Sequence, residues 1–165
     1  MVVREDVAGR NLTVPDNLFG NPDSLHSERK AITICDSTFI FIQKSSNYFF
    51  QRNSYSNHKY RNLLKPFLFV CCDGHIIEVS VLHAATTSDA QVFNNDVIDN
   101  EEDAGDGVFH WFYRNGDVFI LDRGFIYSVE PMRLHGYSVH MPESKYPNET
   151  QLTTDQANKS RLITI

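Results

Sequence analysis

A short apolar run that ends in an acid, at residues 115–125, constrains the fold of this chain more than any other stretch. It begins with an Asn-Gly turn signal, and the apolar residues 118–121 that follow predict a strand. A strand this apolar is typical of a position buried on both faces of a sheet. Asp122 then lies at the rim of the sheet, where open α/β sheets place their chemistry. Asp122 is therefore a candidate functional residue. The alternative is a helix cap, because an amphipathic segment follows at 125–134.

A second acid has a similar setting at residues 31–43. The β-branched and aromatic content of this segment predicts one long central strand. Side chains two apart share a face of a strand, so Asp36 points the same way as four isoleucines, at 32, 34, 40 and 42. An ionised carboxylate on such a face costs several kcal/mol unless it is paired, hydrogen-bonded or bound to a cation. Asp36 is the second candidate, and the alternative is a carboxylate tied to nearby backbone or to a lysine.

The order of the remaining elements favours an α/β fold. Two apolar runs, 67–72 and 75–82, are joined by an Asp-Gly pair that predicts a tight hairpin. Next come a helix near 86–97 with Ser88 or Asp89 as its cap, the strand at 118–121, a helix near 126–134, a strand at 137–141, and a helix from a capping box at 153–156. Three antiparallel strands followed by βα units, flanked by helices, form a ribonuclease H-like mixed sheet. We expect this domain at residues 31–165, after an irregular N-terminal lead-in at residues 1–30.

The two acids converge if the strands that carry them are neighbours in that sheet. Two carboxylates that share a site repel each other unless cations bridge them. Mg²⁺ or Mn²⁺ with oxygen ligands suits Asp36 and Asp122 better than zinc, because no His or Cys joins the pair. The sequence therefore predicts a divalent metal site of the kind that cleaves phosphodiester bonds.

Charge is distributed unevenly along the chain. The net charge of −6 argues against nucleic-acid binding, but no Asp or Glu lies between Asp36 and Asp73. That stretch carries five basic residues: Lys44, Arg52, Lys59, Arg61 and Lys65. Aromatic residues alternate with these cations, a mixture that suits phosphate contacts and base stacking. The alternative is a long solvated connection whose aromatic side chains fold into the core.

Composition excludes several other classes of protein and site. No apolar run approaches the roughly 20 residues of a membrane span, and the first 30 residues lack a signal-peptide core, so we expect a soluble intracellular protein without a membrane partner. The three cysteines, Cys35, Cys71 and Cys72, lie in strand-like runs, which favours buried thiols over disulfides or zinc. The acidic run at 96–106 does not match the glycine and glutamate positions of a calcium loop.

Five separated blocks of the sequence occur in the order found in a known family. They read CDSTFIFIQKSSN, YSNHKYRNLLKPFLFVCCDGHI, TTSDAQVF, GDVFILDRGF and TTDQANKSRLIT. The chain resembles, over residues 31–165, the DDE superfamily endonuclease domains of Harbinger and insertion-sequence-5-like transposases. The resemblance implies that Asp36 and Asp122 are the first and second metal-binding, catalytic acids, with Mg²⁺ or Mn²⁺ as cofactor. Asp89 matches a recurring acid of the family, with a helix cap as its alternative. DNA is the implied substrate, the nucleus the implied location, and Arg123 joins the basic residues as a phosphate contact.

The chain departs from the family pattern in one respect. The resemblance places a third acid, a Glu in a Trp-Val-Val-Glu segment, shortly after the block that reads ANKSRLITI here, and this chain ends before it. We therefore expect a domain that is incomplete at its C-terminus and that holds metal poorly. The alternative function is a non-catalytic, transposon-derived module that binds DNA, a protein partner or a second copy of itself. A third possibility is a remnant gene with no selected function.

Overall fold

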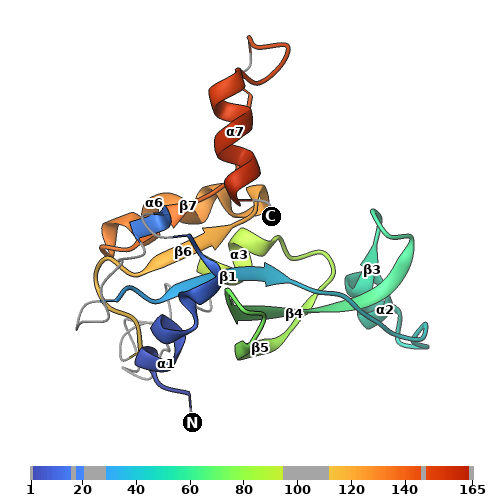
Figure 1. Cartoon of the computed structure of the whole chain (residues 1–165). Coiled ribbons are helices and arrows are strands. Elements are labelled where there is room, and N and C mark those ends of the chain that lie inside the picture. Colours follow the sequence, from blue (N-terminus) through green and yellow to red (C-terminus); the bar gives the residue numbers. More distant parts are fainter. Residues whose placement is uncertain (1, 16–17, 21–28, 95–111, 146–147, 164–165) are drawn as a thin grey trace.

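One mixed sheet with helices around it makes up the fold of the computed structural model, which describes residues 2–15, 18–20, 29–94, 112–145 and 148–163 (Figure 1). The strands of the described residues are β1 (Ile32–Ser37), β2 (Ile40–Phe41), β3 (Tyr55–Ser56), β4 (Arg61–Cys71), β5 (Ile76–Ala84), β6 (Val118–Leu121) and β7 (Ser138–His140). The α-helices are α1 (Arg4–Gly9), α2 (Tyr48–Ser54), α3 (Asp89–Phe93), α6 (Val129–Leu134) and α7 (Thr154–Ile163). Short 3-10 helices are η1 (Asn11–Thr13), η2 (Leu18–Gly20) and η4 (Arg123–Ser128).

The central strand of the sheet is β1. It pairs antiparallel with β4, which pairs antiparallel with β5 on its other edge. On the opposite side β1 pairs in parallel with β6, and β6 pairs in parallel with β7. A mixed α/β sheet flanked by helices is thus confirmed, and this strand order is compatible with a ribonuclease H-like fold. The strands predicted to carry the two acids, β1 and β6, are direct neighbours.

The single strand expected at residues 31–43 is instead two strands, β1 and β2. Both pair with β4 in one register, since Ser37 lies opposite Phe67 and Ile40 opposite Leu64. The interruption falls opposite Pro66, whose carbonyl accepts a hydrogen bond of 3.1 Å from the Thr38 N–H. Because proline has no backbone N–H, Pro66 cannot donate a hydrogen bond to the neighbouring strand, and the β-ladder lacks one hydrogen bond there. The side chains beyond the interruption are exposed, which corrects the expectation of a buried isoleucine face along the whole segment.

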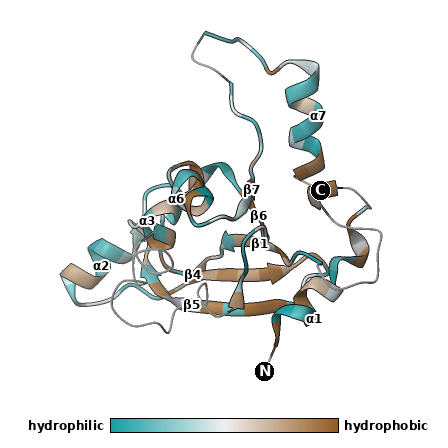
Figure 2. Ribbon diagram, turned by 90° about the vertical axis from the view of Figure 1, so that its left-hand side faces the viewer, coloured by the Kyte–Doolittle hydropathy of each residue, from teal (hydrophilic) through white to brown (hydrophobic). Residues whose placement is uncertain are grey.

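Two apolar layers hold the sheet in place. On one face, side chains of β1, β4 and β6 pack against α3, η4 and α6, and the rings of Phe67, Phe93 and Phe125 meet edge to face at centroid distances of 5.5–5.9 Å. The opposite face carries a smaller cluster in which Ile32 and Val118 contact side chains from η2 and α7. Figure 2 shows the strands in the apolar colour beneath α3 and α6. Burial on both faces makes β6 the buried strand that its sequence predicts.

The N-terminal lead-in differs from the irregular segment that was expected. It contains α1, whose Val7 is fully buried in the larger apolar layer. Arg4 of the same helix donates from Nε to Asp117 Oδ2 at 2.8 Å. The described part of this segment is therefore packed on the domain.

Residues 44–65, for which a solvated connection was the alternative to a nucleic-acid-binding stretch, are ordered. Residues 44–62, which we call the arm, form α2, β3 and the first residues of β4, and they project beyond the sheet (Figure 1). Asn47 caps α2, its Oδ1 accepting from the Phe50 N–H at 3.0 Å. Asn62 Nδ2 donates to Gln51 O at 2.8 Å and to Ser54 Oγ at 2.9 Å, which fixes α2 against β4. The aromatic side chains of the arm stay exposed instead of folding into the core.

The other predicted elements are present with shifted ends. The β4–β5 hairpin forms, but its turn spans residues 72–75, with Gly74 at a φ of +86° in place of a two-residue turn. The predicted helix near 126–134 is divided into η4 and α6. The predicted capping box of α7 is confirmed, since Thr153 N donates to Gln156 Oε1 and Gln156 N to Thr153 Oγ1.

The remaining predictions concern the cysteines, the acidic run at 96–106 and membrane spans. Cys35 and Cys71 are buried, as expected for structural thiols, and Cys72 is half-buried. The acidic run at 96–106, where a calcium loop was rejected, lies outside the described residues, as does the end of the helix expected near 86–97. Within the part of the chain that the structure describes, no helix is long and apolar enough to cross a membrane.

Candidate functional site

Asp36 and Asp122 lie side by side at the carboxyl edge of the parallel pair β1 and β6. The last paired residues of these strands are Cys35 and Leu121, so each acid is the next residue along its strand. Alternation along the strands puts both carboxylates on the face of the smaller apolar cluster. Both are exposed, because the apolar layer ends before this edge. Asp36 is therefore not the inward, buried acid that was expected, although it shares a face with Ile32 and Ile34.

Each acid also has the local role that was weighed as its alternative. Asp122 caps η4, its Oδ1 accepting from the Gly124 N–H at 2.5 Å. Asp36 Oδ1 accepts from the Ser37 N–H at 2.7 Å. A carboxylate has two oxygens with several acceptor positions, so one backbone hydrogen bond orients the group without using its full capacity.

Asp89 reaches the same edge from α3. Its Oδ1 accepts from Ser37 Oγ at 2.7 Å and lies 2.5 Å from Lys65 Nζ. Of the two predicted caps of α3, Ser88 is confirmed, since its Oγ accepts from the Gln91 N–H, and Asp89 is the first residue of the helix. Asp89 is held by side chains of β1 and β4.

Lys65 does not belong with the surface cations among which it was placed. Its side chain is only 9% exposed, and its ammonium also donates to Thr87 O at 2.9 Å. In the sequence, Lys65 is one of five cations of a basic stretch. In the fold, its side chain points inward from β4 toward Asp89. Its position argues against a contact with DNA phosphates, and it supplies the acids with a resident positive charge.

Gly124 opens the space between two of the acids. A Cβ atom at this residue would lie 2.9 Å from Asp122 Oδ1 and 3.4 Å from Asp89 Oδ2. The two carboxylates thus approach one point, which a larger side chain at residue 124 would fill. This glycine lies in the GDVFILDRGF block. That it leaves room between Asp122 and Asp89 could not be found from sequence, because it depends on the position of α3.

The electrostatics of Asp36 reflect the neighbouring acids. Although the Asp36 side chain has exposed surface, the surrounding protein displaces part of the water around its carboxyl group, which raises its pKa above the ordinary value, and repulsion from Asp122 and Asp89 raises it further. The Ser37 N–H and the Lys65 ammonium act in the opposite direction. Asp36 therefore lies within electrostatic reach of both other acids and of Lys65.

The donor chemistry of this site fits a hard divalent cation, because every candidate ligand is a carboxylate oxygen. Oxygens of both Asp89 and Asp122 lie within 3.4 Å of the position that a Cβ atom at Gly124 would take. Among the described residues, however, no group of three or more His, Cys, Asp or Glu side chains is arranged closely enough to hold one ion. Lys65 engages Asp89, whereas Asp36 and Asp122 make no ion pair among those that the described residues form.

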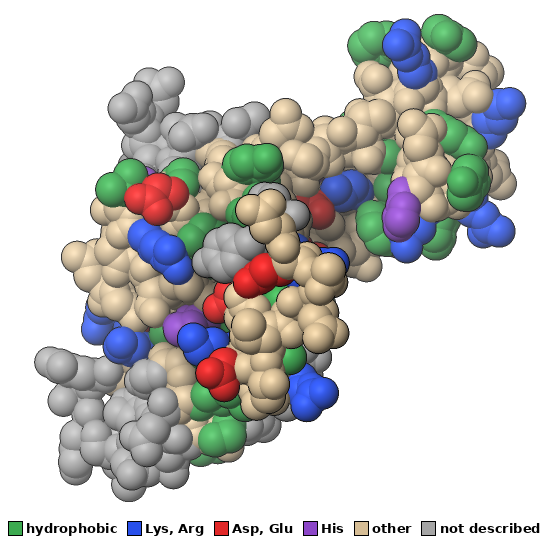
Figure 3. Space-filling model, turned by 90° about the horizontal axis from the view of Figure 1, so that it is seen from above, with side chains coloured by type: hydrophobic (Ala, Val, Ile, Leu, Met, Phe, Trp, Pro, Cys, Tyr) green, Lys and Arg blue, Asp and Glu red, His purple; other side chains and the backbone are tan. Residues whose placement is uncertain are grey.

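The predicted phosphate contacts fall in two places. Lys44, Arg52, Lys59 and Arg61 are exposed on the arm, and Figure 3 shows Lys and Arg side chains, with no Asp or Glu, on the visible face of that projecting part. Two of them stand over aromatic rings: Lys59 Nζ is 5.1 Å from the Phe39 centroid, and the Arg61 guanidinium is 5.6 Å from that of Phe41. Arg123 lies away from the arm, beside Asp122, and donates to Glu143 O at 2.7 Å.

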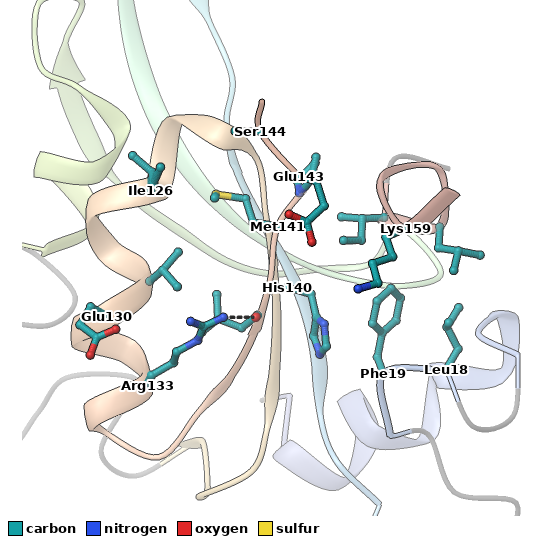
Figure 4. A pocket seen from close by; sticks show the side chains of 15 residues that line it. Leu18, Phe19, Ile126, Glu130, Arg133, His140, Met141, Glu143, Ser144 and Lys159 are labelled. Carbon is teal, nitrogen blue, oxygen red and sulfur yellow. Dashed lines mark hydrogen bonds between the residues drawn. The ribbon is translucent and has the colours of Figure 1, made fainter. Parts of the chain in front are cut away.

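A separate hollow of about 720 Å³ lies between η2, α6, β7 and α7 (Figure 4). Phe19, His140, Arg133 and Lys159 are among the side chains around it. No local sequence pattern indicates this hollow, because the residues that line it come from distant parts of the chain. None of the three acids at the strand edge lines it.

Comparison with known families gives one match. A family model described as DDE superfamily endonuclease matches residues 35–164, a span that includes all three acids and the arm. No curated protein and no solved structure matches the chain.

Proposed function

The chain belongs to the DDE superfamily endonuclease family, and from this premise we propose that it is a transposase-derived, metal-dependent domain that cleaves phosphodiester bonds of DNA. The observation that carries the proposal is the pairing of Asp36 and Asp122 at one edge of two parallel strands. Their mutual repulsion, which contributes to the raised pKa of Asp36, is relieved when cations bind between them.

We assign the metal-binding, catalytic role to Asp36 and Asp122, with Asp89 as a further ligand that Lys65 holds in the metal-free site. Mg²⁺ or Mn²⁺ would activate an attacking water or 3′-hydroxyl and stabilise the leaving oxygen. The backbone N–H groups of Ser37 and Gly124 orient the first two carboxylates. Lys44, Arg52, Lys59 and Arg61 of the arm bind phosphates of the DNA strand, and Arg123 binds one beside the acids.

The finer parts of the proposal follow from the family resemblance. We propose a Harbinger or insertion-sequence-5-like subtype that acts in the nucleus. Because no three potential ligand side chains converge on one point among the described residues, we propose that this domain binds metal weakly and cleaves slowly.

The rival function is a non-catalytic, transposon-derived module that binds DNA or a protein. The ion pair between Lys65 and Asp89 favours this rival, because an acid already neutralised by an ammonium needs no metal ion. Under this alternative the arm retains its binding role, and the acids serve only to cap η4 and to order the edge of the sheet.

The test is Mn²⁺-dependent nicking of supercoiled plasmid by the purified chain. We expect Asp36→Asn and Asp122→Asn to lower the nicking rate about a hundredfold, since each removes a group on which the metal depends. Asp73→Asn is the matched control, because Asp73 is an exposed acid of the β4–β5 turn that pairs with Arg10. Calorimetric titration with Mn²⁺ tests metal binding separately from cleavage.

Equal nicking by all four proteins would remove the catalytic assignment. Absence of nicking together with absence of Asp36-dependent Mn²⁺ binding would favour the non-catalytic module. Mn²⁺ binding that requires Asp36 and Asp122, without nicking, would support the metal site and refute cleavage by this chain.

A further inference from the structure

A second hollow, of about 500 Å³, opens where the arm meets the loop before α3. It is lined by Tyr48, Gln51, Arg52, Tyr55, Asn57 and Thr86. Its volume is within the range of small-molecule sites, about 300–1,000 Å³. Two tyrosine rings, two amide side chains and one guanidinium are the groups that bind the face, the edge and the phosphate of a nucleotide.

The walls of this hollow are held in place without a ligand. Tyr48, Gln51 and Arg52 belong to α2, which Asn47 caps and Asn62 fastens to β4. Tyr55 begins β3, which pairs with β4. A site formed in advance loses little conformational entropy when a ligand binds.

Charge around the hollow favours an anionic ligand. None of its described lining residues is acidic. The arm to which most of them belong carries four exposed cations, Lys44, Arg52, Lys59 and Arg61, and no Asp or Glu. Tyr48 is 75% exposed and Tyr55 38% exposed, so both rings have open area for a base. An exposed aromatic pair with one adjacent cation is the arrangement that binds unpaired nucleotides.

The loop before α3 connects the hollow to the acids. Thr86 in the wall of the hollow precedes Thr87, whose carbonyl accepts from Lys65 Nζ, and the same ammonium contacts Asp89. A DNA strand with a phosphate at the acids would reach the hollow along this loop.

We propose that this hollow binds one unpaired nucleotide of the DNA strand. The base stacks on Tyr48 and Tyr55, the amides of Gln51 and Asn57 hydrogen-bond its edge, and Arg52 binds its phosphate. The hollow's role beside the cleaved bond rests on the proposed nuclease function, whereas its binding of an unpaired nucleotide does not.

The test measures fluorescence anisotropy in EDTA, so that metal and cleavage play no part. The probes are a fully paired 20-base-pair duplex and the same duplex with one bulged adenine. We expect the wild type to bind the bulged duplex about tenfold more tightly, the gain of one stacked base. Tyr48→Ala and Tyr55→Ala should remove this preference, and Arg52→Ala should weaken binding of both probes.

Tyr127→Ala is the matched control for Tyr48→Ala, because Tyr127 is a similarly exposed tyrosine (80% against 75%) in η4, outside the arm. Tyr48→Phe tests the fold and the stacking together, and it should keep the preference. Equal affinity of the wild type for the two probes would overturn the proposal and leave the arm's rings to a protein partner. Loss of the preference in Tyr127→Ala would overturn it as well. Nicking without a bulge preference refutes this site alone, and a preference without nicking refutes the nuclease function alone.

Discussion

Lys65 and the three acids form one charge network at the end of β1. A buried ammonium 2.5 Å from Asp89 compensates the repulsion that Asp36, Asp89 and Asp122 exert on one another. Under the proposed function, a divalent cation would compete with Lys65 for Asp89.

We predict that Lys65→Met destabilises the fold by about 2 kcal/mol, because it leaves a partly buried Asp89 carboxylate without its cation. Adding Asp89→Asn should recover most of that loss, since the remaining amide carries no charge. The free energy of unfolding from urea titration, measured for both single variants and the double variant, gives the coupling between the two residues.

Lys59→Met serves as the control for this cycle, because Lys59 is exposed on the arm. It should leave the stability unchanged. The network is refuted if Lys65→Met unfolds at the wild-type urea concentration, or if the double variant is no more stable than Lys65→Met.

At the scale of helices and strands, the sequence predicts those elements that depend on residues close together in the chain. The β6 strand, the β4–β5 hairpin and the capping box of α7 were identified because apolar runs, turn residues and caps act over a few neighbours. The break between β1 and β2 was missed, because it depends on Pro66 standing opposite in another strand. The helix α2 of the arm was not predicted for a similar reason: Asn62 fixes α2 only after β4 has formed.

The candidate site was predictable to the same extent. Asp122 at the end of a strand and Asp36 within a strand could be found from sequence, and their adjacency follows once β1 and β6 pair. That Asp36 lies near the end of its strand could not be found, because the break after β1 depends on β4. The inward turn of Lys65 and the space at Gly124 could not, because both depend on where α3 packs. Long-range packing, not local pattern, determines these contacts.

The side chain of His140 in β7 contacts the N-terminal segment, and its pKa differs between the folded and the unfolded chain. Its ring lies 4.8 Å from that of Phe19 in η2, and Ser138 Oγ is 3.2 Å from its Nε2. Burial lowers the pKa of His140, and the charges of Arg133 and Lys30 lower it further. The unfolded chain therefore takes up a proton at His140 at a higher pH than the folded chain does.

We predict that this difference lowers stability as the pH falls below about 6.5, the ordinary pKa of histidine. Above that pH the contribution of His140 is fully present. His140→Gln should flatten the dependence of the free energy of unfolding between pH 7.5 and about 5, measured by urea titration. His75→Gln, an exposed residue of the β4–β5 turn, should leave the slope as it is. An unchanged slope in His140→Gln would show that other groups carry the effect.

At the scale of the whole molecule, one buried carboxylate joins three distant segments. Asp117 is fully buried just before β6, where it accepts from the N–H groups of Ala31 and Arg114 and pairs with Arg4 of α1. The entry to β1, the entry to β6 and the N-terminal helix are thus fastened at one point. The two strands that carry the candidate acids therefore depend on a residue at their opposite ends.

We predict that Arg4→Met destabilises the whole domain by about 3 kcal/mol, because it leaves the Asp117 carboxylate buried without its cation. Arg10→Met is the matched control: its partner Asp73 is exposed, so loss of that ion pair should not change stability measurably. Because Asp117 anchors both β1 and β6, Arg4→Met should also weaken Mn²⁺ binding under conditions where the domain is still folded, and calorimetry at low temperature measures this. If Arg4→Met and Arg10→Met have the same free energy of unfolding, then α1 does not contribute to the stability of the sheet. The relative position of the two acids is in that case set by the pairing of β1 and β6 alone.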